Sequence, residues 1–255
     1  MTVTIAGAPV LGYLLASVRI VAWLWVAPPF NNTAIPSMAK VVLALALSFA
    51  VSPLIAQQSV PTSFGELIIV VLTQVMIGAA MGFATLLLFS AVSAAGSFID
   101  LFGNFQLAAA YDPLMLNQNS VFGRLYELMA VTLLMVTDGH LIVIGGLLNT
   151  FRYLPLGGSV DVSGWGTIYT TAMGMFFSIG LEIALPLVAV LFITDLALAL
   201  ISRVAPAMNP MSVMQAAKIG LTLLLAGVAF PVVPHAVDNV VDLITQAIGS
   251  LGGAP

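Results

Sequence analysis

The chain has 255 residues, of which 61% are hydrophobic and 6% are charged, whereas average soluble domains are about 45–50% apolar and about 25% charged. Six Lys and Arg and ten Asp and Glu residues cannot cover a soluble surface of this length, so the composition excludes a soluble globular protein and predicts a polytopic membrane protein. The net charge is -4, and no run of like charges along the sequence favours nucleic-acid binding. The absence of cysteine excludes disulfides and thiolate chemistry.

Apolar segments alternate along the chain with short breaks marked by proline. We expect each segment to be a helix, because backbone polar groups in lipid must be paired within their own segment. No basic residue precedes Arg19, which favours a retained first span over a cleaved signal peptide. The predicted spans are 10–26, 38–56, 67–102, 125–151, 165–201 and 211–233. The tail is predicted to be an amphipathic helix, from the spacing of its apolar residues Val237, Val240, Val241, Ile244 and Ile248.

Two predicted spans are too long for a bilayer alone. A span needs about 20 residues for a hydrocarbon core of about 30 Å, whereas segment 67–102 would be roughly 50 Å long at ~1.5 Å per residue. Segments 67–102 and 165–201 must therefore tilt, bend or be buried in protein outside the lipid. Pro186 could kink the second of them, and Gly78 and Gly82 form a small-xxx-small pattern that allows a close helix contact in the first.

Three charged residues, Glu182, Asp195 and Lys218, lie within otherwise apolar segments. Each needs a partner, water or a protein interface, because a lone charge at a bilayer centre costs at least ~2.5–3.5 kcal/mol. These residues indicate either an ion relay in a secondary transporter or a structural ion pair or inter-subunit contact.

An enzymatic role has little support in the sequence. Asp138 and His140 could pair a carboxylate with a general base, but residues two apart project from different faces of a helix. The sequence holds no P-loop, HExxH or GxSxG motif. We therefore predict a non-enzymatic protein without a cofactor.

Residues 103–119, GNFQLAAAYDPLMLNQN, interrupt the apolar sequence with amides, aromatic residues and a proline. Asp112 before Pro113 favours a turn. Taken alone, these residues favour a surface loop between two spans.

Two signatures, in this order along the chain, resemble the FliR family of flagellar export-gate proteins and its injectisome SctT-like relatives. The resemblance covers roughly residues 10–235. The motifs that carry it are Asp112-Pro113, Gly139-His140, TFRYLPLG at 150–157, Leu185-Pro186, LISRVAPAMN at 200–209 and Lys218.

The resemblance implies a single all-α domain over 1–255, a polytopic membrane protein of long kinked helices and helical hairpins with FliP-like and FliQ-like halves. It also implies a pore-forming subunit that assembles with FliP and FliQ, works with FlhA and FlhB, and passes unfolded flagellar proteins. Its place would be the bacterial inner membrane, within the flagellar basal body. Three alternatives stay open: an injectisome export-gate subunit, a secondary transporter using Glu182 and Asp195, and a structural membrane scaffold.

In the FliR family, the segment that corresponds to 103–119 lies inside the channel and forms part of its plug. The composition suits that place, because non-helical backbone at membrane depth is tolerated only within protein or beside water, and apolar side chains can narrow and dewet a pore. The predicted plug residues are Phe105, Gln106, Leu107, Tyr111, Asp112, Pro113, Leu114, Met115 and Leu116. The residues predicted to pack against neighbouring subunits are Arg203, Pro206, Asn209 and Lys218.

Overall fold

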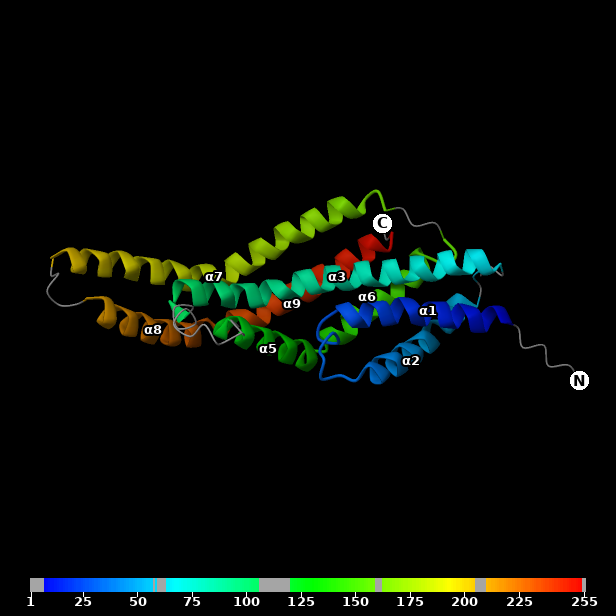
Figure 1. Ribbon diagram of the computed structural model, residues 1–255, viewed down its shortest axis with the longest axis horizontal. Coiled ribbons are helices and arrows are strands. Elements are labelled where there is room, and N and C mark those ends of the chain that lie inside the picture. Colours follow the sequence, from blue (N-terminus) through cyan, green and yellow to red (C-terminus); the bar gives the residue numbers. More distant parts are fainter. Residues whose placement is uncertain are drawn as a thin grey trace, which may run out of the picture. The chain divides into compact units, whose positions relative to one another are not determined.

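The computed structural model describes residues 7–56, 58, 63–105, 120–158, 162–204 and 210–253. Within these ranges all regular structure is helical (Figure 1), which confirms the prediction of an all-α fold. The helices are α1 (Gly7–Val26), α2 (Ser37–Ile55), α3 (Phe64–Phe102), α5 (Val121–Val136), α6 (Gly139–Tyr153), α7 (Trp165–Val204), α8 (Pro210–Ala229) and α9 (Val232–Leu251).

The described helices are those of a polytopic membrane protein, as predicted. Four stretches are long and apolar enough to cross a membrane, and up to six are if the broken pairs α5–α6 and α8–α9 each count as one span. With 39 and 40 residues, α3 and α7 measure about 60 Å along their axes at ~1.5 Å per residue, about twice a hydrocarbon core of ~30 Å. The four unbroken candidates are Pro9–Val26, Ser37–Ile55, Phe64–Phe102 and Trp165–Val204.

The predicted continuous helix over 125–151 is wrong, although the two helices that replace it can still form one broken span. Its residues belong to two helices, because α5 ends at Val136 and α6 begins at Gly139. Asp138 between them has φ 57°, a left-handed conformation that the short polar side chain of Asp tolerates but that cannot continue a right-handed helix. Apolar composition continues across this position, so hydropathy alone does not reveal the break.

The chain forms two compact units. Unit 1 consists of Met1–Leu88, Asp138–Met173 and Val241–Pro255, and unit 2 of Phe89–Thr137 and Gly174–Val240. The prediction of one helical domain over 1–255 stays a prediction.

In unit 1, α3 packs closely against α1 through two glycines. A Cβ atom on Gly78 would collide with the carbonyl oxygen of Arg19 and lie 2.9 Å from the Cβ of Ala22. A Cβ atom on Gly82 would lie 2.9 Å from the Cβ of Val26. The close contact predicted from the small-xxx-small pattern is therefore confirmed.

The α1–α2 hairpin (Figure 1) is joined by a hydrogen bond of 2.7 Å from the hydroxyl of Tyr13 to the carbonyl oxygen of Leu45. The hydroxyl of Tyr169 in α7 likewise donates to the carbonyl oxygen of Ala80 in α3 at 2.7 Å. Both bonds give a Tyr hydroxyl in an apolar environment the partner that it needs. The fully buried large side chains of unit 1 include Ile20, Trp23, Leu24, Ile77, Met81, Leu147, Phe151 and Leu156.

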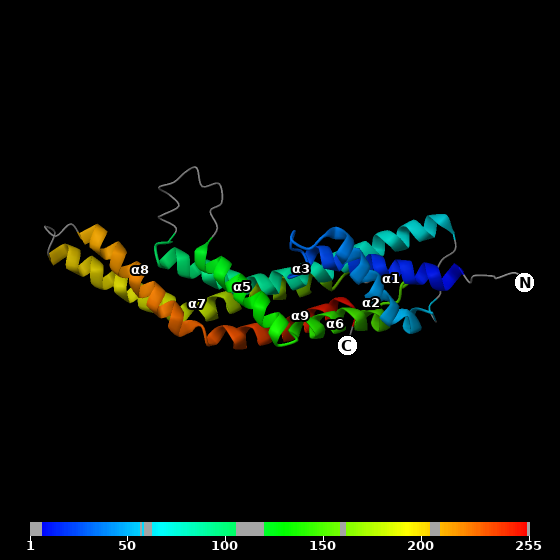
Figure 2. The ribbon, with the colours of Figure 1, turned by 90° about the horizontal axis from the view of Figure 1, so that it is seen from below.

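Unit 2 holds the hairpin of α7 and α8, which lie side by side in Figures 1 and 2. Two glycines again permit close contacts. A Cβ atom on Gly96 of α3 would collide with the carbonyl group of Phe122 in α5, and one on Gly180 of α7 would lie 3.3 Å from the carbonyl oxygen of Ala91 in α3. The backbone of α3 is thus the surface on which both neighbouring helices pack.

The C-terminal tail forms the predicted amphipathic helix, α9. The five apolar residues from which it was predicted are all buried, and the intervening Asp238 and Asp242 are exposed. The helical period of the apolar residues was therefore sufficient to assign both the element and its buried face.

Candidate functional site

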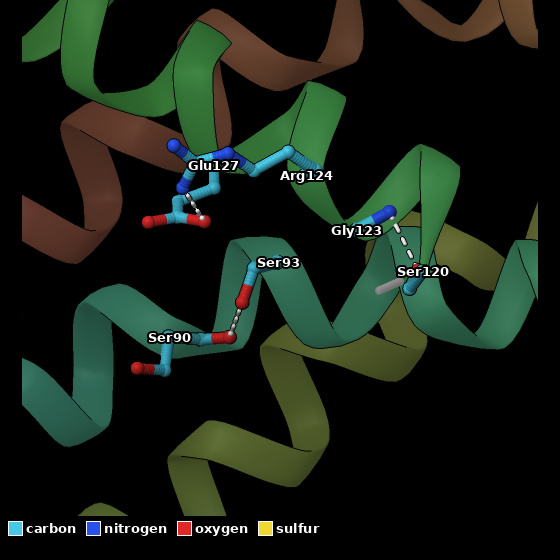
Figure 3. Close-up of polar contacts among 6 residues, drawn as sticks. All are labelled: Ser90, Ser93, Ser120, Gly123, Arg124 and Glu127. Atoms are coloured by element: carbon cyan, nitrogen blue, oxygen red, sulfur yellow. Dashed lines mark hydrogen bonds and ion pairs between the residues drawn. The ribbon is translucent and has the colours of Figure 1, made fainter. Parts of the chain in front are cut away.

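The residues on both sides of segment 106–119 are fixed to one another by Asp100, which is only 1% exposed near the end of α3. Its carboxylate accepts hydrogen bonds from the backbone N–H of Phe122, at 3.0 and 3.2 Å, and from the hydroxyl of Ser120. Ser120 is the N-cap of α5 and accepts a bond of 2.8 Å from the N–H of Gly123 (Figure 3). A carboxylate and a hydroxyl thus pair N–H groups that a helix N-terminus leaves free. We call Asp100, Ser120, Phe122 and Gly123 the α3–α5 clamp.

Further contacts hold the end of α3 in place. Asn104 has φ 63°, a left-handed conformation common just beyond a helix end. The ring of Phe105 packs edge-on against the ring of Phe122, with centroids 5.2 Å apart. A Cβ atom on Gly103 would lie 2.9 Å from the Cγ2 of Thr222 in α8. Of the predicted plug residues, Phe105 is therefore half-buried against α5, and those from Gln106 to Leu116 lie outside the described residues.

Two of the three charges in apolar segments pair within the chain. The ammonium group of Lys218 lies 2.7 and 2.8 Å from the carboxylate oxygens of Asp195, and this bond joins α8 to α7. The Lys218 side chain is 4% exposed and that of Asp195 44%, so the carboxylate offsets the loss of water around the buried ammonium group. The third charge, Glu182, is exposed on α7.

The predicted subunit-packing residues have different surroundings. Arg203 is exposed in the last turn of α7, where its charge suits the helix C-terminus, whereas Lys218 is buried and bound to Asp195. Pro206 and Asn209 lie outside the described residues. The role of these four residues in subunit packing stays a prediction.

A buried arginine joins three helices of unit 1, and the sequence reasoning missed it. Arg19 in α1 is 0% exposed. Its guanidinium donates to the Oε1 of Gln74 in α3 at 2.7 Å, to the hydroxyl of Thr150 in α6 at 3.3 Å, and to the carbonyl oxygen of Leu154 at 3.0 Å. It also lies 4.2 Å from the ring centre of Phe151, a cation–π distance. Because Leu154 is the C-cap of α6, the cation lies at the negative end of that helix dipole.

Two glutamines extend this cluster to the chain after α6. Gln74 donates to the carbonyl oxygen of Leu156 at 3.0 Å, and the N–H of Leu156 donates to the Oε1 of Gln58 at 2.9 Å. Gln58 also donates to the carbonyl oxygen of Phe151 at 3.1 Å. The exit from α6 is thus bonded to side chains from two distant parts of the sequence. In the described ranges no three His, Cys, Asp or Glu side chains gather closely enough to hold a metal ion.

These features define the class as a polytopic α-helical membrane protein whose described polar clusters join helices to one another. The family "Bacterial export proteins, family 1" matches residues 10–244, and the chain belongs to this family. The resemblance predicted from the sequence motifs is confirmed.

Similar proteins come from several bacteria. "Flagellar biosynthetic protein FliR" of Escherichia coli (strain K12) is 31% identical over 248 residues, covering 94% of this chain and 93% of that protein. The protein of the same name from Bacillus subtilis (strain 168) is 24% identical, with coverage of 94% and 93%. "Secretion system apparatus protein SsaT" of Salmonella typhimurium (strain LT2) is 25% identical over 195 residues, 75% of each chain.

Proposed function

We propose that this chain is a non-enzymatic, pore-forming subunit of the type III export gate of the bacterial flagellum, in the inner membrane within the basal body. It assembles there with FliP and FliQ, works with FlhA and FlhB, and passes unfolded flagellar proteins. The observation that carries this proposal is the family match over residues 10–244, together with 31% identity to a flagellar biosynthetic protein over nearly the whole chain.

The surface of α7 supports an assembly rather than a monomer in lipid. Within the 18-residue apolar stretch that makes α7 a candidate span, only 22% of the residues are buried within the chain, and at about 60 Å the helix is about twice as long as a hydrocarbon core. Lipid can cover only about half of such a helix, so other proteins are needed to cover the rest. Its large exposed apolar side chains include Phe177, Leu181, Leu185, Phe192, Ile193, Leu196, Leu200, Ile201 and Val204.

Gentle detergent extraction followed by mass analysis tests the assembly. We expect a large complex that contains this chain and two other small helical membrane proteins, and loss of the chain should abolish both motility and export of flagellar proteins. A monomer or homodimer of the chain in every detergent, together with normal motility of cells that lack the chain, would contradict the proposal.

We further propose that residues 103–119 close the pore as its plug. The α3–α5 clamp supports this role, because it holds both ends of the segment together on rigid helices. Shortening 106–116 should leave the complex assembled but make the membrane leaky to small solutes, measured as dye or ion entry. Deletion of Ala254 and Pro255, which lie outside the segment, serves as the control. A tight membrane with normal export in the shortened variant would reject the plug.

An injectisome export gate is the second candidate, favoured by the similarity to "Secretion system apparatus protein SsaT" over 75% of the chain. The two functions differ in what stops when the chain is removed. Loss of flagellar filaments with intact secretion of other proteins favours the flagellar gate, and the reverse favours the injectisome.

A further inference from the structure

A small cavity in unit 2 lies between α7 and α9, and it combines a carboxylate with two other polar side chains. Its volume is about 100 Å³, room for a few water molecules or the end of one long side chain. Glu182 lines it from α7, and His235 and Asn239, one turn apart, line it from α9. The apolar lining residues are Ile179, Ile183, Val232 and Ala236.

Glu182 differs from the other carboxylates of unit 2 that face apolar surroundings. Asp100 is bonded within the α3–α5 clamp, and Asp195 is paired with Lys218. Glu182 lies near the middle of α7, in a candidate membrane span, and makes no ion pair or side-chain hydrogen bond with any residue in the described ranges. A carboxylate in such a helix is expected to have a partner.

No Lys or Arg of unit 2 is both unpaired and within reach of Glu182. All six Lys and Arg residues of the sequence fall within the described ranges. Of those in unit 2, Lys218 is paired with Asp195 and Arg124 with Glu127. Arg203 lies on α7 itself, about 30 Å along the helix from Glu182 at ~1.5 Å per residue. The counter-charge is therefore expected from outside this unit.

The backbone of Glu182 supplies a second acceptor. Pro186 lies inside α7, and because proline has no N–H, the carbonyl oxygen of Glu182 loses the donor four residues ahead that a helix normally supplies. The same residue thus carries a carboxylate and an under-bonded carbonyl oxygen. A ligand with several N–H donors suits this set better than one with a single donor.

We propose that this cavity receives the basic side chain, Lys or Arg, of a neighbouring protein subunit, with Glu182 as its counter-ion and Asn239 and His235 as further polar contacts. The four apolar lining residues fit the alkyl stem of such a side chain, whereas a bare metal ion would require more ligating groups than one carboxylate and one imidazole. The existence of a neighbouring subunit rests on the proposed function.

The test measures the fraction of the full-length chain that enters the high-mass complex after gentle extraction, normalised to its total abundance. Glu182→Lys should lower this fraction about tenfold or more, because like charges at an interface cost at least the equivalent free energy. Glu182→Gln, which keeps the shape but not the charge, should lower it less but measurably. Glu127→Lys is the matched control, since Glu127 is an exposed carboxylate of the same unit, and it should assemble as the unchanged chain does.

The outcomes separate this inference from the proposed function. If the unchanged chain never enters a complex, the proposed function fails and the inference falls with it. If the unchanged chain assembles and Glu182→Gln assembles equally well, the inference alone is overturned.

A melting experiment distinguishes a free cation from an inserted side chain. If Na⁺ or K⁺ raises the melting temperature of the unchanged complex but not that of the Glu182→Gln complex, and both assemble equally, Glu182 binds a free cation and the inference is overturned. A Lys→Glu or Arg→Glu change in a neighbouring subunit that restores assembly of Glu182→Lys would identify the inserted side chain.

Discussion

Arg19 donates hydrogen bonds to an amide, a hydroxyl and a backbone carbonyl, all of them buried. Replacing it by Met keeps an unbranched apolar side chain but leaves two acceptors, the Gln74 Oε1 and the Leu154 carbonyl, without their donor, whereas the Thr150 hydroxyl keeps its bond to the Leu147 carbonyl. Each unsatisfied buried group costs about 1–3 kcal/mol. We therefore expect Arg19→Met to lower the free energy of unfolding by about 2–6 kcal/mol, measured by denaturant unfolding of the purified chain in micelles.

Arg124→Met is the matched control, because Arg124 forms an exposed ion pair with Glu127 three residues away (Figure 3). Exposed pairs contribute about 0–1 kcal/mol. Equal losses of stability in the two variants would show that the Arg19 cluster does not brace unit 1.

The α3–α5 clamp makes a prediction that can be read at single amides. Asp100→Asn keeps the size of the side chain but removes the charge that accepts from Phe122, so the protection of that amide from hydrogen exchange should fall about tenfold. Ser120→Ala instead removes the acceptor of Gly123, whose amide should then lose the most protection. Residue-resolved hydrogen exchange of both variants checks this contrast. The same amide responding most in both would contradict the assigned bonds.

These polar clusters could not be predicted from the sequence, because their partners are far apart along the chain. Arg19 bonds residues 131 and 135 positions away, and nothing local to it indicates Thr150 or Leu154. Pairing of charges was expected for the apolar segments, but the sequence does not state which charges pair. Glu182 and His235 line the same cavity only because of how α7 and α9 pack, and the sequence does not give that packing.

At the scale of helices, the glycines of α3 set how closely α1 can approach. Gly78→Ala would place a methyl group against the Arg19 carbonyl and Ala22, and overpacking of this kind costs about 1–3 kcal/mol. Gly145→Ala in α6 is the control from the same unit, because a Cβ atom there meets nothing within 4 Å. Since Ala is favoured over Gly inside a helix by roughly 0.5–1 kcal/mol, the control should be stabilised.

Thermal unfolding of the two variants in the same detergent measures the change in melting temperature, which should fall for Gly78→Ala and rise for Gly145→Ala. Two variants that shift the melting temperature in the same direction would contradict the close packing of α1 on α3.

The helices themselves were largely predictable, and the exceptions have local causes. Spans and the amphipathic tail follow from composition and period, which repeat over many residues and so tolerate single irregularities. The break at Asp138 depends on one backbone conformation. Asp-Gly is compatible with a turn, but within a long apolar segment this weak local signal was outweighed by the hydropathy on both sides.

At the scale of the whole molecule, the question is what covers the apolar surface. Helices α3 and α7 are each about 60 Å long at ~1.5 Å per residue, and in their 18-residue apolar stretches only 33% and 22% of the residues are buried within the chain. A bilayer of ~30 Å hydrocarbon thickness covers about 20 residues of a helix. Lipid alone would therefore leave apolar side chains of both helices in water, at a cost of about 25 cal/mol per Å².

The cysteine-free sequence allows this cover to be mapped with single spin-labelled cysteines along the exposed face of α7, at Phe177, Leu185, Phe192, Leu196 and Leu200. Lipid admits oxygen to a label, water admits a polar nickel reagent, and a packed protein neighbour excludes both. In the purified chain without its neighbours, we expect each label to be reached by one reagent or the other. In the assembled complex, the oxygen-accessible part of α7 should shrink to fewer than about 20 residues or vanish, because lipid covers no more than that length. Oxygen access that persists unchanged at all five positions would mean that lipid, and not protein, surrounds this helix. The proposed export-gate assembly would then lack α7 as the surface that contacts its neighbours.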